Sequence, residues 1–153
     1  MELFLASDQP INPSHGWKGE RYLTVGDIDE TEQRVRAHFT LPHVRFLGAH
    51  TGCSCGFEYG VKELTTEEER AEDEAGRLSV AALHDFLETQ LRQGRAVQLL
   101  SCWQGEESRT PREVLEVSPD YFGGKSFDLP RSAFLKIRGA VEQRDAADEA
   151  REG

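Results

Sequence analysis

Residues 66–94, TEEERAEDEAGRLSVAALHDFLETQLRQG, carry the clearest helix signal in the chain and decide its fold. Thr66 and Glu69 have the spacing of a capping box, in which the hydroxyl and the carboxylate bond free amides of the first turn. Gly76 weakens the middle and Ser79 could cap a second segment, so the stretch predicts either a kinked helix or two successive helices. The second half has apolar residues on one face, at spacings of three and four: Val80, Leu83, Phe86, Leu87 and Leu91.

Short apolar runs on both sides of this helix predict the strands of a sheet. Residues 125–129 are a weaker candidate, and residues 132–137 form a last apolar segment. Strands and helices alternate too irregularly for a doubly wound parallel sheet. We therefore expect an α+β fold, with a mixed or mostly antiparallel sheet of about five strands packed against one main amphipathic helix over residues 79–93. The predicted strands are residues 2–6, 21–28, 43–50, 96–103 and 113–118.

Two further segments bear on the organisation of the chain. Residues 29–38 could form a short helix, although the alternation over residues 35–41 favours an extended conformation. After Val141 the chain contains only charged residues, alanine, one glutamine and a final glycine, which cannot anchor a core. We expect a single domain over residues 1–140, followed by an acidic tail over residues 141–153 that is frayed or disordered.

The chain is acidic, with 28 Asp and Glu residues against 18 Lys and Arg residues and a formal net charge of −10. This charge repels phosphate backbones and anionic lipid surfaces, so we expect no nucleic-acid partner and no membrane partner, whereas a basic protein partner would suit it. No run has the length of a membrane span, and the first residues lack the features of a signal peptide. The 3 cysteines do not suggest a disulfide framework, so we expect a cytoplasmic protein with reduced thiols.

Residues 50–60, HTGCSCGFEYG, gather the most reactive side chains and are called the Cys/His loop below. Thiolate and imidazole are ligands that Zn²⁺ prefers, and the glycines permit tight turns. The spacing argues against zinc, because paired cysteines of structural zinc sites usually have two to four residues between them, and here a single residue separates them. A glycine-rich turn with inert thiols is the alternative. The candidate zinc ligands are His50, Cys53 and Cys55, with Cys102 or His43 as candidates for the fourth position.

The same two cysteines could instead be redox-active. A resolving thiol is present, although a disulfide between cysteines one residue apart closes a small, strained ring. The Cys-x-x-Cys spacing of thioredoxin-like enzymes is absent, and no helix start follows directly behind the nucleophile. A lone nucleophile, Cys53 or Cys55, assisted by His50 or His84, is a further form of this hypothesis. On sequence alone, redox chemistry ranks below metal binding.

Other motif-like stretches are better explained by structure. Residues 123–126, GGKS, match the end of a phosphate-binding loop, but Pro119 stands where the motif needs its first glycine. The acidic residues within 67–74 lack the ligand pattern of a calcium loop and are typical of a solvated helix face. His84 borders the apolar stripe of the helix and is interpreted as a boundary histidine, and Cys102 as a small core residue.

Three functional classes follow from these observations. The first is a small acidic binding or interaction domain without catalysis, with or without a structural zinc at the Cys/His loop. The second is a thiol-dependent enzyme that uses Cys53 or Cys55. The third is a small-molecule enzyme whose site is assembled from separate loops, with His15 and Trp17 as candidate lining residues. The lack of a recognisable catalytic constellation in the sequence favours the first class.

Overall fold

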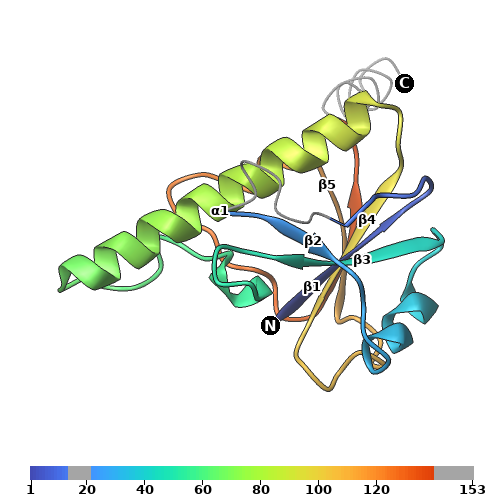
Figure 1. Cartoon of the computed structure of the whole chain (residues 1–153), viewed down its shortest axis with the longest axis horizontal. Helices are drawn as coiled ribbons and strands as arrows, with labels where there is room; N and C mark the ends of the chain where they lie inside the picture. Colours follow the sequence, from blue (N-terminus) through green and yellow to red (C-terminus); the bar gives the residue numbers. More distant parts are fainter. Residues whose placement is uncertain (14–21, 140–153) are drawn as a thin grey trace, which may run out of the picture.

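The computed structural model describes residues 1–13 and 22–139, which form a six-stranded sheet with a long helix on one face (Figure 1). The predicted α+β class and the mixed sheet are confirmed, with six strands in place of five. None of the described helices is long and apolar enough to cross a lipid bilayer. In chain order, with η for a 3-10 helix, the elements are β1 (Glu2–Ser7), β2 (Thr24–Gly26), η1 (Glu32–His38), β3 (His43–Gly48), η2 (Ser54–Gly56), α1 (Glu67–Arg92), β4 (Val97–Cys102), β5 (Glu113–Val117), η3 (Pro119–Tyr121) and β6 (Ala133–Ile137).

The sheet has the strand order β2-β3-β1-β4-β6-β5. Every neighbouring pair is antiparallel except β5 and β6, which are parallel. A parallel pair needs a crossover between its strands, and the chain between β5 and β6 provides one that contains η3. The last apolar segment is therefore a true strand, β6. The weaker candidate over residues 125–129 is not a strand, because only an isolated bridge joins Phe127 to Tyr59 there.

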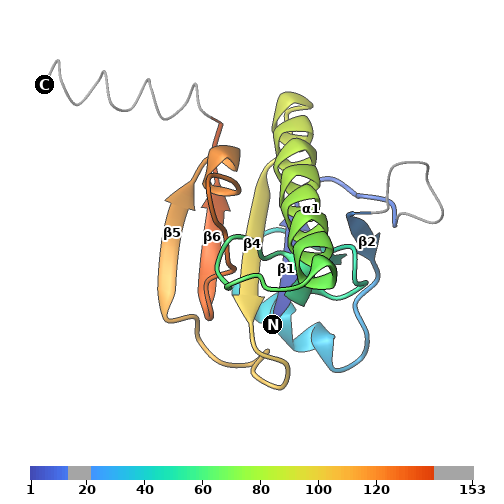
Figure 2. The ribbon, with the colours of Figure 1, turned by 90° about the vertical axis from the view of Figure 1, so that its left-hand side faces the viewer.

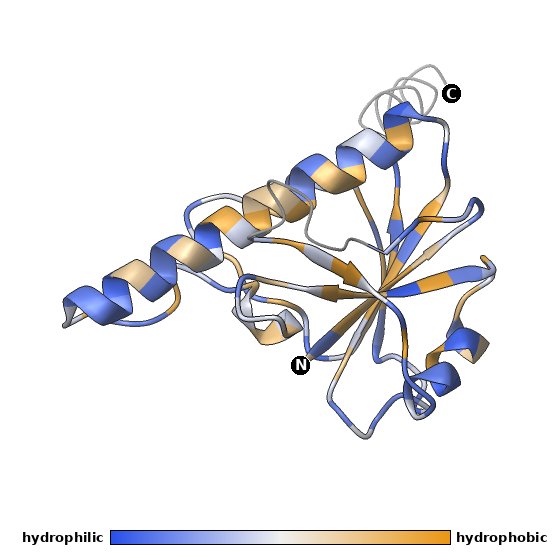
Figure 3. Cartoon of the chain, viewed as in Figure 1, coloured by the Kyte–Doolittle hydropathy of each residue, from blue (hydrophilic) through white to orange (hydrophobic). Residues whose placement is uncertain are grey.

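Helix α1 runs over the middle of the sheet, above β1 and β4 (Figure 2). The predicted apolar stripe faces the sheet: Val80, Leu83 and Leu87 are buried, and the other two members are partly buried. The first turns of α1 extend beyond the sheet and are mainly hydrophilic (Figure 3). The Thr66 hydroxyl accepts a hydrogen bond from the amide of Glu69, which confirms the predicted N-cap.

The expectation of a kinked or divided helix is wrong, because α1 is continuous through Gly76. Gly76 is buried, and a Cβ atom added there would lie 2.0 Å from the carbonyl oxygen of Glu58. The glycine therefore makes room for the backbone of the Cys/His loop and does not break the helix. Ser79 caps no second segment; it is fully buried and bonds His50.

A second core covers the opposite face of the sheet. It is closed by η1 and the residues that follow it, with Val35 and Phe39 packed on side chains of β1 and β4. The rings of Phe39 and Phe134 lie 5.8 Å apart between centroids. The helical alternative for residues 29–38 is thus closer to the structure than the extended one. His15, Trp17 and residues 141–153 lie outside the described residues. The lining role expected for His15 and Trp17 and the frayed or disordered tail therefore stay predictions.

Candidate functional site

The Cys/His loop follows β3 and is fastened to the sheet by one buried serine. The hydroxyl of Ser54 accepts a hydrogen bond from the amide of Leu3 (2.8 Å) and donates one to the carbonyl of Leu47 (2.6 Å). Leu3 lies on β1 and Leu47 on β3, so a single fully buried side chain ties the loop to both strands. Gly52, with φ of +84°, reverses the chain ahead of Cys53 in a backbone conformation that glycine tolerates.

Cys53 and Cys55 are joined by a disulfide bond, so the expectation of reduced thiols is wrong for these two residues. Cys55 is exposed, whereas Cys53 is half-buried. Two donors approach the Cys53 sulfur: the amide of Cys55 at 3.3 Å and the hydroxyl of Thr51 at 3.6 Å. That hydroxyl also reaches the Cys53 carbonyl at 3.1 Å, and it can rotate towards the sulfur if negative charge develops there. The two cysteines therefore differ: one is accessible, and the other has donors that would stabilise a thiolate.

His50 is held in one orientation by α1. The Ser79 hydroxyl accepts a hydrogen bond from the backbone amide of His50 (3.0 Å) and lies 3.0 Å from its Nδ1. Because the hydroxyl oxygen already accepts from that amide, its hydrogen is free to bond Nδ1, which leaves the proton of the neutral imidazole on Nε2. Nε2 lies 2.6 Å from Oε1 of Glu72. The sequence suggested Ser79 only as a helix cap and Glu72 only as part of a solvated acidic face, although their spacing of seven residues places them on one face of a helix.

A hollow of about 380 Å³ opens beside the disulfide. Cys55 and His50 line it from the Cys/His loop, and the first two turns of α1 line it from the other side. Five carboxylates and a single lysine ammonium line its walls, so the hollow is strongly acidic. The charged lining residues are Glu58, Lys62, Glu68, Glu69, Glu72 and Asp73.

Of the predicted zinc ligands, Cys53 and Cys55 are joined to each other, and His50 lines the same hollow as Cys55. Among the described residues, the donor atoms of these three do not form a compact metal-ligand group, and neither candidate for the fourth position lies nearby. His43 begins β3, and at about 3.3 Å per residue the strand places it roughly 16 Å from the end where the loop starts. Cys102 is buried in the second core, on the face of the sheet away from α1. Burial, with help from nearby carboxylates, raises the pKa of its thiol to about 12, so it is an inert core residue as predicted. Zinc binding at the loop stays a prediction for the reduced protein.

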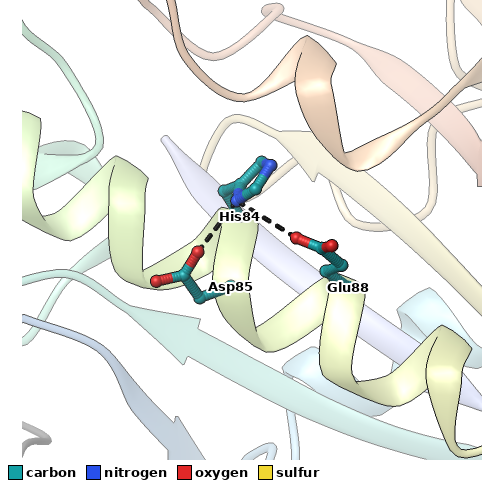
Figure 4. Close-up of side chains that lie close together, drawn as sticks. All are labelled: His84, Asp85 and Glu88. Carbon is teal, nitrogen blue, oxygen red and sulfur yellow. Dashed lines mark hydrogen bonds and ion pairs between the residues drawn. The ribbon is translucent and has the colours of Figure 1, made fainter. Parts of the chain in front are cut away.

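His84 lies in a group of carboxylates where α1 meets η3 (Figure 4). Its Nδ1 is 2.9 Å from Asp85 and 3.8 Å from Glu88, and its Nε2 is 3.0 Å from Asp120. The hydrogen bond to Asp85 raises the pKa of His84, the bond to Asp120 adds to this, and partial burial opposes both. Ligand atoms of His84, Asp85 and Glu88 lie within 4.8 Å of one another, which would also permit a metal ion. Since both ring nitrogens already face carboxylates, the geometry fits an imidazolium ion that bridges α1 and η3.

A pair of buried carboxyl groups, also missed in the sequence, lies at the start of β1. The Oε2 atoms of Glu2 and Glu107 are buried and accept no hydrogen bond from any described donor. Burial raises the pKa of Glu2 to about 7, and the contact with Glu107 adds to this. Burial would also raise the pKa of Glu107, but hydrogen bonds from the amides of Glu107 and Gly105 outweigh it and lower the pKa. Glu2 is therefore the partner that carries a proton below about pH 7, and in that state its carboxyl can donate to Glu107.

Another hollow, of about 740 Å³, lies at the other end of α1. It is lined by residues around Gly94 and by the end of β6. Its basic side chains are largely engaged by neighbours: Arg92 pairs with Glu88, and Arg138 with Glu116. Glu88 and Asp120, two of the carboxylates around His84, contribute to its lining, whereas His50, Cys53 and Cys55 do not.

Comparisons of the chain with protein-family models, with curated proteins and with solved structures found no match. The functional assignment therefore rests on the chemistry of the residues described above.

Proposed function

We propose that the chain is a thiol–disulfide redox protein whose reactive centre is the Cys53–Cys55 pair. The observation that carries this proposal is the asymmetry of the pair on an anchored loop. Cys55 is exposed at the edge of a hollow. The Thr51 hydroxyl lies 3.6 Å from the Cys53 sulfur and 3.9 Å from the Cys55 sulfur, and the Cys53 sulfur also accepts from the amide of Cys55 at 3.3 Å. Such an arrangement lets a partner attack one sulfur and lets the other leave as a stabilised thiolate.

The exchange reaction can be written for reduction of the protein by two partner thiols. A partner thiolate attacks the Cys55 sulfur, the S–S bond breaks, and its electron pair stays on Cys53. The amide of Cys55 and the hydroxyl of Thr51 hold the resulting Cys53 thiolate. A second partner thiolate then attacks the partner sulfur of the mixed disulfide and releases Cys55 as a thiolate. One protein disulfide and two partner thiols thus give a protein dithiol and one partner disulfide. In the reverse sequence the protein dithiol reduces the partner disulfide to two thiols, and the protein disulfide forms again.

Zinc binding and purely structural roles for the loop are less well supported. A sulfur in a disulfide cannot act as a thiolate ligand, and both nitrogens of His50 are engaged by Ser79 and Glu72. A structural zinc site would also need a fourth ligand from outside the loop. If zinc were nevertheless bound by the reduced protein, it would be retained at about one ion per chain after gel filtration, and a chelator would lower the melting temperature.

Thiol counting in glutathione buffers of increasing oxidation tests the redox proposal. After denaturation, the oxidised protein should show one free thiol, that of Cys102, and the reduced protein should show three. The Cys102→Ser variant is the matched control and should interconvert between zero and two thiols. Three free thiols across the whole range of buffers would contradict the proposal.

Mixed-disulfide trapping tests the roles of the two cysteines. Cys53→Ser removes the resolving thiol, so treatment with the small disulfide cystamine should leave a stable adduct on Cys55. Cys55→Ser keeps only the half-buried sulfur and should form the adduct at least about tenfold more slowly, since exchange depends on access. Equal adduct formation in the two variants, measured by mass spectrometry, would show that the assignment of roles is wrong.

A further inference from the structure

The hollow beside Cys55 is lined mainly by carboxylates. Its carboxylates come from two segments: Glu58 belongs to the Cys/His loop, and the other four belong to the first turns of α1. Lys62 is its only cationic lining residue, and it lies 3.4 Å from Glu58, which balances it. The remaining acidic groups face the same space as the exposed sulfur.

These carboxylates differ in whether they already form hydrogen bonds within the protein. Glu72 forms a hydrogen bond with His50, and Asp73 accepts one from the amide of Gly60 (2.9 Å). Glu69 accepts one from the hydroxyl of Thr65 at the start of the helix. The side chain of Glu68 forms no hydrogen bond or ion pair with any other described residue. It is therefore the lining carboxylate most available to a ligand, and its removal disturbs no contact seen in the fold.

Resting on the proposed redox function, we infer that the partner thiol is carried by a cationic group, and specifically by a basic peptide segment that contains a cysteine. Carboxylates around the reacting sulfur attract a cationic thiol and repel an anionic one, glutathione included. The overall charge of −10 acts in the same direction at longer range.

The energetic scale is that of electrostatic steering, which changes association rates by about ten- to a thousandfold and weakens as salt is added. Because the lining groups are largely exposed to water, we expect an effect near the lower end of this range. The same carboxylates disfavour negative charge on the Cys55 sulfur. A cationic partner offsets their field and an anionic partner adds to it, so the rate of exchange should depend strongly on the charge of the incoming partner.

The test compares the rates at which three small thiols reduce the oxidised protein at low salt: cationic cysteamine, neutral 2-mercaptoethanol and anionic 3-mercaptopropionate. Each rate is corrected to thiolate concentration. Cysteamine should react about tenfold faster than 3-mercaptopropionate, and the ratio should approach one in about 0.5 M salt. A basic and an acidic hexapeptide, each with one cysteine, should show the same order.

Glu68→Lys should lower the ratio of the two rates at least about threefold. Glu113→Lys, which makes the same charge change on β5 at the far edge of the sheet, is the matched control and should leave the ratio unchanged. Equal rates for the three thiols in the unmodified protein, or equal effects of the two variants, would overturn selection by the hollow while leaving the redox centre intact. Failure to form or reduce the disulfide with any thiol would instead overturn the redox function itself.

Discussion

At the scale of single residues, Ser54 joins the reactive loop to the sheet. Its hydroxyl satisfies the amide of Leu3 and the carbonyl of Leu47, two backbone groups that would otherwise be buried without partners. A buried polar group that loses its partner costs more free energy than the hydrogen bond itself contributes. The position of the two flanking cysteines therefore depends on a side chain that takes no part in exchange.

Ser54→Ala should lower the free energy of unfolding by about 1–3 kcal/mol, because the amide of Leu3 is left buried and unbonded. It should also slow adduct formation at Cys55, since the loop is no longer fixed. Urea unfolding measures the first effect and cystamine labelling the second. Ser108→Ala, at an exposed serine, is the control and should change neither. If Ser54→Ala were as stable as Ser108→Ala, a water molecule would have to replace the Ser54 hydroxyl.

At the scale of elements, α1 has two functions along its length. Its second half supplies the apolar face that packs on the sheet, and its first half supplies the acidic wall of the hollow. Each half supplies one partner of His50: Glu72 from the first and Ser79 from the second. Gly76 lies between the two halves, where the backbone of Glu58 crosses the helix. The helix is thus both a core element and part of the candidate site.

Gly76→Ala should destabilise the protein even though alanine is the better helix former. The gain in helix propensity is about 1 kcal/mol, whereas a Cβ atom 2.0 Å from the Glu58 carbonyl oxygen forces the backbone to move, at a cost of about 1–3 kcal/mol or more. Thermal unfolding should show a lower melting temperature. Gly123→Ala, where an added Cβ meets nothing within 4 Å, should be neutral or slightly stabilising.

Leu83→Ala should lower the free energy of unfolding by about 2–5 kcal/mol, because the side chain is fully buried between α1 and the sheet. Val114→Ala, on a strand position that is 64% exposed, should change it by less than about 0.5 kcal/mol. Denaturant titration of the two variants checks the difference. A small effect at Leu83 would contradict the packing of α1 on the sheet.

At the scale of the whole molecule, the burial of carboxyl groups in this acidic chain makes the stability of the folded protein depend on pH. The folded protein raises the pKa of Glu2 from its ordinary value of 4.5 to about 7, chiefly through burial. A group whose pKa is raised by folding contributes stability below its unfolded pKa and loses that contribution as pH rises through the folded pKa. The raised pKa of His84 acts in the same direction at higher pH. Stability should therefore fall between about pH 5 and pH 8.

Glu2→Gln should remove part of this dependence, since glutamine resembles the protonated side chain and can donate to Glu107. The variant should melt at a higher temperature than the unmodified protein at pH 8, and the difference should shrink towards pH 5. Glu113→Gln, at an exposed carboxylate, controls for the change in net charge. Melting curves whose difference does not depend on pH would show that Glu2 is ionised in the folded protein.

The sequence by itself determined the elements whose signals are local. The capping box at Thr66, the apolar stripe of α1 and the main strands follow from spacings of two to four residues, which depend only on the geometry of a helix or a strand. The Cys/His loop was recognised as the chemically distinctive segment for the same reason, since its residues are adjacent in the chain.

Only the tertiary structure decided what surrounds that loop. Ser54 meets Leu3 across 51 positions, and His50 meets Ser79 across 29. Gly76 weakens a helix by local propensity, yet in the fold it is the one residue small enough for the crossing backbone of Glu58. The disulfide, the acidic hollow and the Glu2–Glu107 pair likewise depend on strand order and on the placement of α1. These contacts form between segments far apart in the chain, and local spacing carries no information about which of them will meet.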